Sequence, residues 1–133
     1  AGGHTSQFEV PRPPALTLIK TLLLLTKCCL TELSTTDAME VEEVQLFQKD
    51  ALLYVDEACE TADESMYIRS GADARLWKAR VLLQQSKPIT EVKKILDWVI
   101  DHPSEAVSLE QRDEAKLLIL STVMNGWLPN KMS

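Results

Sequence analysis

The residues of this chain that could do acid–base chemistry are its two histidines, His4 and His102. Histidine is the side chain most often used for proton transfer near neutral pH. His4 falls in a start rich in glycine and proline. His102 follows a segment with helical periodicity, where its charged form would suit a helix C-terminus. Neither histidine has cysteines or carboxylates at the spacing of a zinc site, so we expect neither to be catalytic or metal-binding.

The three cysteines, Cys28, Cys29 and Cys59, are the next candidates for a nucleophile or a metal ligand. Adjacent residues on a helix point about 100° apart, so Cys28 and Cys29 cannot hold one metal from the same face. An odd count is also a poor disulfide framework and favours a reducing compartment, the cytosol or the nucleus. We interpret all three as small buried apolar residues.

The remaining motifs of catalysis are missing from the sequence. It has no glycine-rich dinucleotide loop, P-loop, nucleophile elbow or zinc-protease helix. The sequence therefore predicts a protein that is not an enzyme and has no cofactor. A net charge of −6 and a pI near 4.9 would repel phosphate backbones, which argues against a nucleic-acid partner.

The length of 133 residues fits one domain, and the composition favours helices. We expect an extended lead-in over residues 1–14, one helical domain over 15–128 and a tail over 129–133. In the lead-in, Phe8 and Val10 could dock on the body, and Pro14 is suited to open a helix.

The first predicted helix runs from about Ala15 to Leu33 and has leucines on nearly every face. A helix that is apolar all round is usually surrounded by other helices, so we expect this one at the centre. Lys20 and Lys27, seven residues apart, mark its narrow wet face. These charges favour a core helix over a membrane span.

Apolar residues at steps of three and four predict four further helices. Their apolar stripes are Val44, Phe47, Ala51, Tyr54, Val55 and Ala58, then Ala72, Leu76, Ala79 and Leu83, then Val92, Ile95, Leu96 and Val99, and last Ala115, Leu118, Ile119 and Thr122. The predicted starts and breaks are the Asp37–Glu40 capping box, Ser70–Gly71, Pro88, Pro103, the Ser108–Gln111 capping box and Gly126 as the last cap, with Trp127 folding back.

These elements predict an all-α fold, either a five-helix bundle or a short solenoid of tetratricopeptide-like helical hairpins. Residues 78–83 resemble residues 114–119, 36 positions later, which is close to a tetratricopeptide period. The residues do not follow that family's motif, since Glu91 and Trp98 stand where small residues are expected. The prediction therefore concerns shape only.

A partner-binding face is predicted on the third and fourth helices. Trp77 and Trp98 both lie off the apolar stripes, and residues 66–100 hold seven bases and three acids. Tryptophan and arginine dominate interface energetics. The candidate residues are Trp77, Arg75, Lys78, Arg80, Lys94 and Trp98. Two alternatives remain open: the tryptophans pack against another helix, or the bases neutralise residues 34–65, which hold ten acids and one base.

Three blocks in order carry a resemblance to a known family. They are Pro14-Ala15-Leu16 leading into the leucine-rich helix; Phe47-Gln48-Lys49-Asp50, followed by Leu76, Ala79 and Leu83 and then Ile95-Leu96-Asp97; and Gln111-Arg112-Asp113-Glu114-Ala115, running into Leu117-Leu118-Ile119 and, past Trp127, Leu128-Pro129. Over most of residues 14–129, the chain resembles the C-terminal regulatory domain of the sterol regulatory element-binding proteins. It departs from them by shorter connections and by the absence of a further helix after the third block.

The resemblance implies a regulatory domain of a membrane-bound transcription factor precursor, on the cytosolic side of the endoplasmic reticulum. Such a domain binds the β-propeller of the sterol-sensing escort protein SCAP and does no chemistry of its own. It does not itself insert into the membrane. Two other functions remain open: a tetratricopeptide-like scaffold in an unrelated cytosolic or nuclear complex, and a helical bundle that encloses an apolar ligand between leucines and cysteines.

Overall fold

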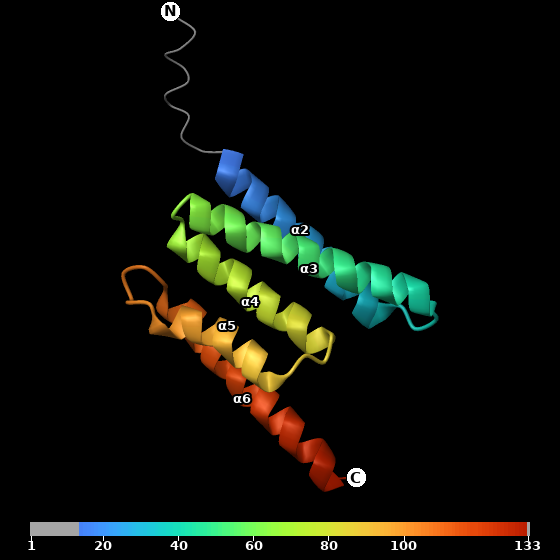
Figure 1. Ribbon diagram of the computed structural model, residues 1–133. Coiled ribbons are helices and arrows are strands. Elements are labelled where there is room, and N and C mark those ends of the chain that lie inside the picture. The colour runs from blue at the N-terminus through green and yellow to red at the C-terminus, as the bar shows by residue number, and fades with distance from the viewer. Residues whose placement is uncertain (1–13, 133) are drawn as a thin grey trace, which may run out of the picture.

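The computed structural model describes residues 14–132, with the side chains of residues 14–124. This part of the chain forms five helices and no strand, so the predicted all-α fold is confirmed (Figure 1). The helices are α2 (Pro14–Thr35), α3 (Val41–Glu64), α4 (Ile68–Gln84), α5 (Ile89–Asp101) and α6 (Leu109–Met132). The expected lead-in, with His4, Phe8 and Val10, lies outside the described residues, apart from Pro14.

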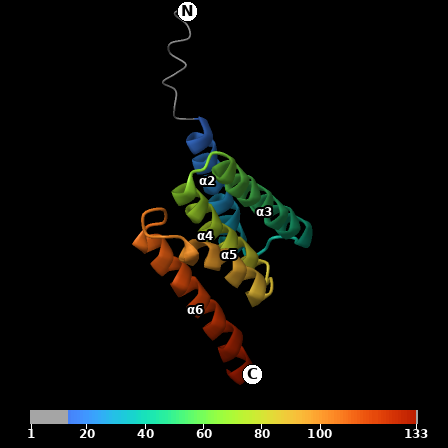
Figure 2. The ribbon, with the colours of Figure 1, turned by 60° about the vertical axis from the view of Figure 1, so that its left-hand side comes forward.

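The helices form two layers of consecutive hairpins. Each helix packs against the next one in the sequence, and α4 also contacts α2 and α6, whereas α3 and α5 do not contact each other. One layer therefore holds α2, α4 and α6, and the other holds α3 and α5. Figures 1 and 2 show α6 running past the other helices toward its C-terminal end.

The central helix is α4, which contacts all four of the others. Its buried residues are mostly small: Gly71, Ala72, Ala74, Leu76, Ala79, Val81 and Leu82. Small side chains on several faces let neighbouring helices approach closely from different directions. The four-helix environment of α4 follows from this composition.

The prediction that residues 15–33 form the surrounded helix was wrong. Helix α2 contacts only α3 and α4 and lies at one edge of the array. Its buried face is narrow, with Ile19, Leu22, Thr26 and Cys29, while Leu24 remains 60% exposed. Leucine content does not distinguish a central helix from an edge helix, because leucines on the outer face of a helix can remain exposed without another helix packing against them.

Several predicted helix boundaries are confirmed. Pro14 is the first residue of α2, Pro88 is the N-cap of α5, and α5 ends before Pro103. At the start of α6, the Gln111 N–H donates to Ser108 Oγ at 3.1 Å, and the Ser108 N–H donates to Gln111 Oε1 at 3.0 Å. This reciprocal pair is the predicted capping box.

Other boundaries differ from the prediction. The capping box of α3 is formed by Glu40 and Glu43, one turn later than Asp37. The break before α4 falls at Met66, whose φ is 60°, and Gly71 lies inside the helix. Helix α6 continues through residue 126 to Met132, so Gly126 is not its last cap, and the side chain of Trp127 is outside the described ones.

The predicted apolar stripes do form the core. Residues of α4, α5 and α6 make one cluster, in which Leu76, Ala79, Leu96, Val99 and Ala115 are buried. Ala79 and Ala115 occupy matching positions in the 36-residue echo. Two smaller clusters join α3 and α4 to α2. Cys29 and Cys59 are buried as expected, but Cys28 is exposed.

Candidate interaction groove

The six predicted partner-binding residues do not form one surface. On α4, Arg75 and Trp77 point about 200° apart, because successive helical residues turn by about 100°. Arg75 and Lys78 face α3, whereas Trp77 and Arg80 face the layer of α2 and α6. The tryptophans of α4 and α5 thus lie in two separate environments.

Arg75 and Lys78 are paired with carboxylates of α3. The Arg75 guanidinium donates to Asp63 Oδ1 and Oδ2 at 3.1 and 2.8 Å. Lys78 Nζ lies 2.8 Å from Asp56 Oδ1. The structure therefore agrees with one of the alternatives for Arg75 and Lys78: both bases pair with acids of residues 34–65.

Trp98 is covered by its own protein. The Arg75 guanidinium carbon lies 3.8 Å from the centre of the indole ring, and the His102 ring centroid lies 4.1 Å away. His102 Nδ1 is 2.6 Å from the Trp98 carbonyl oxygen, which fixes the imidazole at the end of α5. A cation held over an indole face in this way stabilises the packing of α3, α4 and α5.

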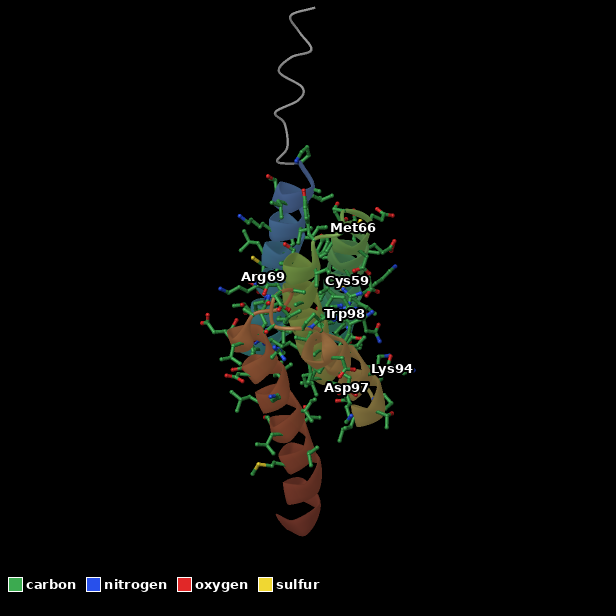
Figure 3. All side chains as sticks on the ribbon, turned by 90° about the vertical axis from the view of Figure 1, so that its left-hand side faces the viewer. Cys59, Met66, Arg69, Lys94, Asp97 and Trp98 are labelled. Atoms are coloured by element: carbon green, nitrogen blue, oxygen red, sulfur yellow. The ribbon has the colours of Figure 1, made fainter. Side chains whose placement is uncertain are left out.

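Lys94 lies on the same helix as Trp98 but is exposed at the outer edge of the molecule (Figure 3). Helix α5 makes no contact with α2. Lys94 is therefore separated from the environment of Trp77, and it serves below as a matched control for charge.

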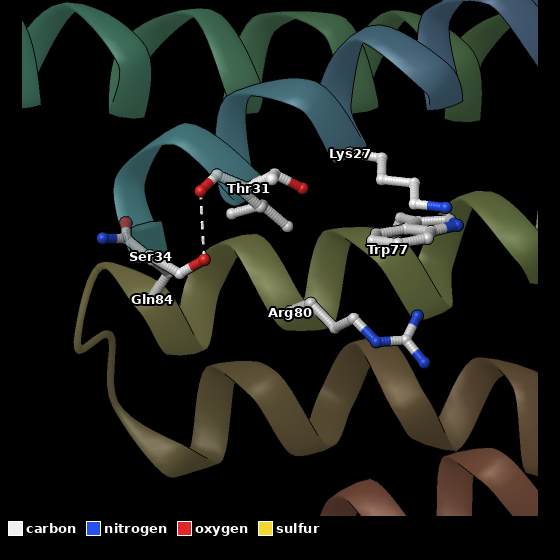
Figure 4. A pocket seen from close by; sticks show the side chains of 7 residues that line it. Lys27, Thr31, Ser34, Trp77, Arg80 and Gln84 are labelled. Carbon is white, nitrogen blue, oxygen red and sulfur yellow. Dashed lines mark hydrogen bonds between the residues drawn. The ribbon is translucent and has the colours of Figure 1, made fainter. Parts of the chain in front are cut away.

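Trp77 and Arg80 instead line an open groove between α2 and α4, with a volume of about 360 Å³ (Figure 4). Its lining residues are Lys27, Leu30, Thr31 and Ser34 of α2 and Trp77, Arg80 and Gln84 of α4. Leu30 and Trp77 pack against the buried cluster of α2, α3 and α4 and form the apolar wall. No residue of the acidic α3 lines the groove.

The groove has a positive rim. The Arg80 guanidinium lies 4.6 Å from the centre of the Trp77 ring and forms an ion pair with Glu114 of α6. The Arg80 side chain is partly withdrawn from water, and this burial lowers its pKa. Lys27 faces the same space from α2 and makes no ion pair with any of the described side chains. Polar groups complete the rim, and the Ser34 hydroxyl donates to the Thr31 carbonyl oxygen at 3.1 Å.

The partner-binding residues predicted from the sequence include Trp77 and Arg80 of this groove, but not Gln84 or any residue of α2. The i, i+3, i+7 series Trp77, Arg80 and Gln84 is visible in the sequence, and Lys27 marks the wet face of α2. Nothing in either pattern says that the two faces meet, because that depends on the contact of α2 with α4 across the layer.

A second, smaller cavity of about 60 Å³ lies between the start of α5 and the middle of α6. It is lined by Ile89, Val92, Lys93, Ile119, Thr122 and Val123. One leucine, Leu30, lines the groove, none lines the second cavity, and no cysteine lines either, so neither has the lining of leucines and cysteines expected for the apolar-ligand alternative. Within the described residues, no group of three or more histidine, cysteine or acidic side chains is arranged to hold a metal ion.

No family model, curated protein or solved structure matches this chain. Over residues 14–132, none of the helices combines the length and the apolar character needed to cross a bilayer.

Proposed function

We propose that this chain is a non-catalytic helical protein-interaction domain and that the groove between α2 and α4 is its docking surface. The observation that carries the proposal is the position of Trp77, half-buried on the wall of an open groove with an arginine beside its ring. Tryptophan and arginine are enriched among the few residues that contribute most of the binding energy at protein interfaces.

The chemistry of the lining supports binding over catalysis. Its side chains offer one indole, one leucine, two cations and three neutral polar groups. An active site needs a nucleophile held beside a base, or a pair of titratable groups with opposed pKa shifts. The hydroxyls of Thr31 and Ser34 are exposed, and Ser34 donates to a backbone carbonyl rather than to a base.

Site-specific photo-crosslinking tests the proposal. A benzophenone amino acid at Gln84, inside the groove, should crosslink a protein partner in cells, and one at Lys94 should not. The double variant Trp77→Ala/Arg80→Ala should abolish the Gln84 crosslink while its circular dichroism spectrum stays helical. Crosslinks from Lys94 alone, or crosslinks from Gln84 that the double variant leaves unchanged, would remove the groove as the docking surface.

The resemblance to the sterol regulatory element-binding proteins supports a finer proposal. The partner would be the β-propeller of a SCAP-type escort protein, and the domain would act on the cytosolic face of the endoplasmic reticulum. This proposal rests on the three sequence blocks quoted above. A pull-down with the isolated propeller decides it, because failure of the folded domain to bind would leave the scaffold alternative, in a cytosolic or nuclear complex.

A further inference from the structure

We propose that the groove receives a short acidic segment of the partner that carries one large apolar side chain. This inference rests on the proposed function and adds the chemistry of the ligand. Three features support it: the charge of the rim, the ion pair between Glu114 and Arg80 at the edge of the groove, and the dimensions of the apolar wall.

The charge of the rim favours carboxylates. Lys27 and Arg80 approach the groove from opposite helices, and both cations lie beside the same apolar surface. Each cation is therefore available to pair with a carboxylate of a segment bound along the apolar wall. The lining holds these two cations and no carboxylate, so its charge is opposite in sign to the net charge of −6 of the whole chain.

Glu114 already places a carboxylate at the edge of this site. It belongs to α6, it is outside the residues that line the groove, and it pairs with Arg80. The Glu114 side chain is 41% exposed, so a partner carboxylate can reach and replace it without unfolding the helix. Glu114 therefore acts as an internal competitor that holds Arg80 ready beside Trp77.

The apolar wall sets the size of the segment. From Lys27 to Ser34, α2 rises about 10 Å, since each helical residue adds about 1.5 Å. An extended peptide covers that length with about three residues, at about 3.3 Å each. The whole groove, with a volume of about 360 Å³, has room for one leucine or aromatic side chain together with its backbone. The sequence type is thus one apolar residue flanked by aspartate or glutamate.

Fluorescence anisotropy with three labelled peptides tests this chemistry. The probes are Glu-Asp-Glu-Trp-Glu-Asp-Glu, a counterpart in which every acid is lysine, and an acidic peptide in which alanine replaces the tryptophan. At low salt, the first peptide should bind at least about tenfold more tightly than either of the others. Equal or tighter binding of the lysine peptide would overturn the proposal.

Two charge variants locate the effect. Glu114→Gln should tighten the acidic peptide about threefold, because it frees Arg80, and it should not tighten the lysine peptide. Lys27→Gln should weaken the acidic peptide about threefold or more, while the matched control Lys94→Gln should leave it unchanged. If Glu114→Gln weakens both charged peptides alike, Glu114 has only a structural role and the competitor mechanism is wrong.

The two proposals fail in different ways. If the Gln84 crosslink to a partner persists but the acidic peptide does not bind in preference to the others, the groove is a docking surface for another chemistry and only this inference falls. If the crosslink is absent as well, the docking surface itself is wrong.

Discussion

Trp77 and Trp98 are two half-buried tryptophans, each with an arginine beside its ring, and they have different surroundings. Arg75 over Trp98 is held by Asp63, and its side chain is only 13% exposed. Arg80 beside Trp77 is 31% exposed and borders an open groove. At Trp98, Arg75 and His102 cover the indole ring, so this pair contributes to the packing of the helices. At Trp77, the groove leaves one side of the ring open, so this pair forms part of the proposed binding surface.

The largest expected difference between the two regions is in stability. Trp98→Ala removes a side chain that Arg75, His102 and the main core cluster surround, and it should lower the free energy of unfolding by about 3 kcal/mol. Trp77→Ala should cost about half as much, since the groove leaves one side of that ring open. Urea denaturation followed by circular dichroism measures both, with phenylalanine variants as controls. Equal losses would show that the two rings are packed alike.

The pH dependence of stability at Cys59 reports how well water is excluded from the packing of α3 and α4 near Arg75. Burial raises the pKa of this thiol from 9.0 to about 11, and it outweighs the opposing effect of Arg75. The folded state therefore holds the proton more tightly than the unfolded state. Its contribution to stability is present below pH 9 and is lost as the pH rises toward 11. The difference in unfolding free energy between wild type and Cys59→Ala should fall by about 2 kcal/mol between pH 8 and pH 11.

A flat difference between the Cys59→Ala variant and the wild type over that pH range would mean that water reaches the thiol. Taking the difference in unfolding free energy between the two proteins also cancels the contribution of the tyrosines and lysines that titrate in the same range, because both proteins contain them.

The two arginine ion pairs should differ by a smaller amount. A double-mutant cycle with Arg75→Met and Asp63→Asn should give a coupling of about 1 kcal/mol, because the pair is bidentate but Asp63 is half exposed. The cycle with Arg80→Met and Glu114→Gln should give about 0.5 kcal/mol or less. A larger coupling for the second pair would contradict the view that a ligand can replace Glu114.

The smallest expected effect is on the stability of Lys27→Gln. Lys27 is exposed and makes no ion pair with the described side chains, so its replacement should change the unfolding free energy by less than about 0.5 kcal/mol. Thermal denaturation of this variant beside Lys94→Gln is the check. A substantial loss of stability would show that Lys27 supports the fold and would weaken its role in the groove.

Much of the fold could be predicted because it depends on local chemistry. The steps of three and four give the buried faces of α3 to α6, and the Ser108–Gln111 capping box forms as its sequence indicates. The errors lie where two local signals compete. Gly71 was taken as a break, but it is buried inside α4, where a Cβ would come within 3.2 Å of Arg75 and 3.4 Å of Trp98. Its small size serves packing there, and the chain turns at Met66.

Half of the candidate site could be predicted in the same way. The positions of Trp77 and Arg80 off the apolar stripe of α4 are a property of helical periodicity. The partners of Arg75 and Lys78 are not, because opposite charges far apart in the sequence pair only when α3 and α4 lie side by side. The same bases that suggest an interface in the sequence neutralise α3 in the fold.

By itself, the sequence determined that this protein is helical, where its apolar faces lie, and that tryptophan and arginine recur beside them, because each of these follows from residue type and spacing along one helix. Only the tertiary structure decided that α4 is central, that Trp98 is covered, and that Trp77 and Lys27 share a groove. Those outcomes depend on which helices are in contact. Small residues on α4 allow four helices to pack against it, whereas the leucines of α2 do not bring further helices around α2.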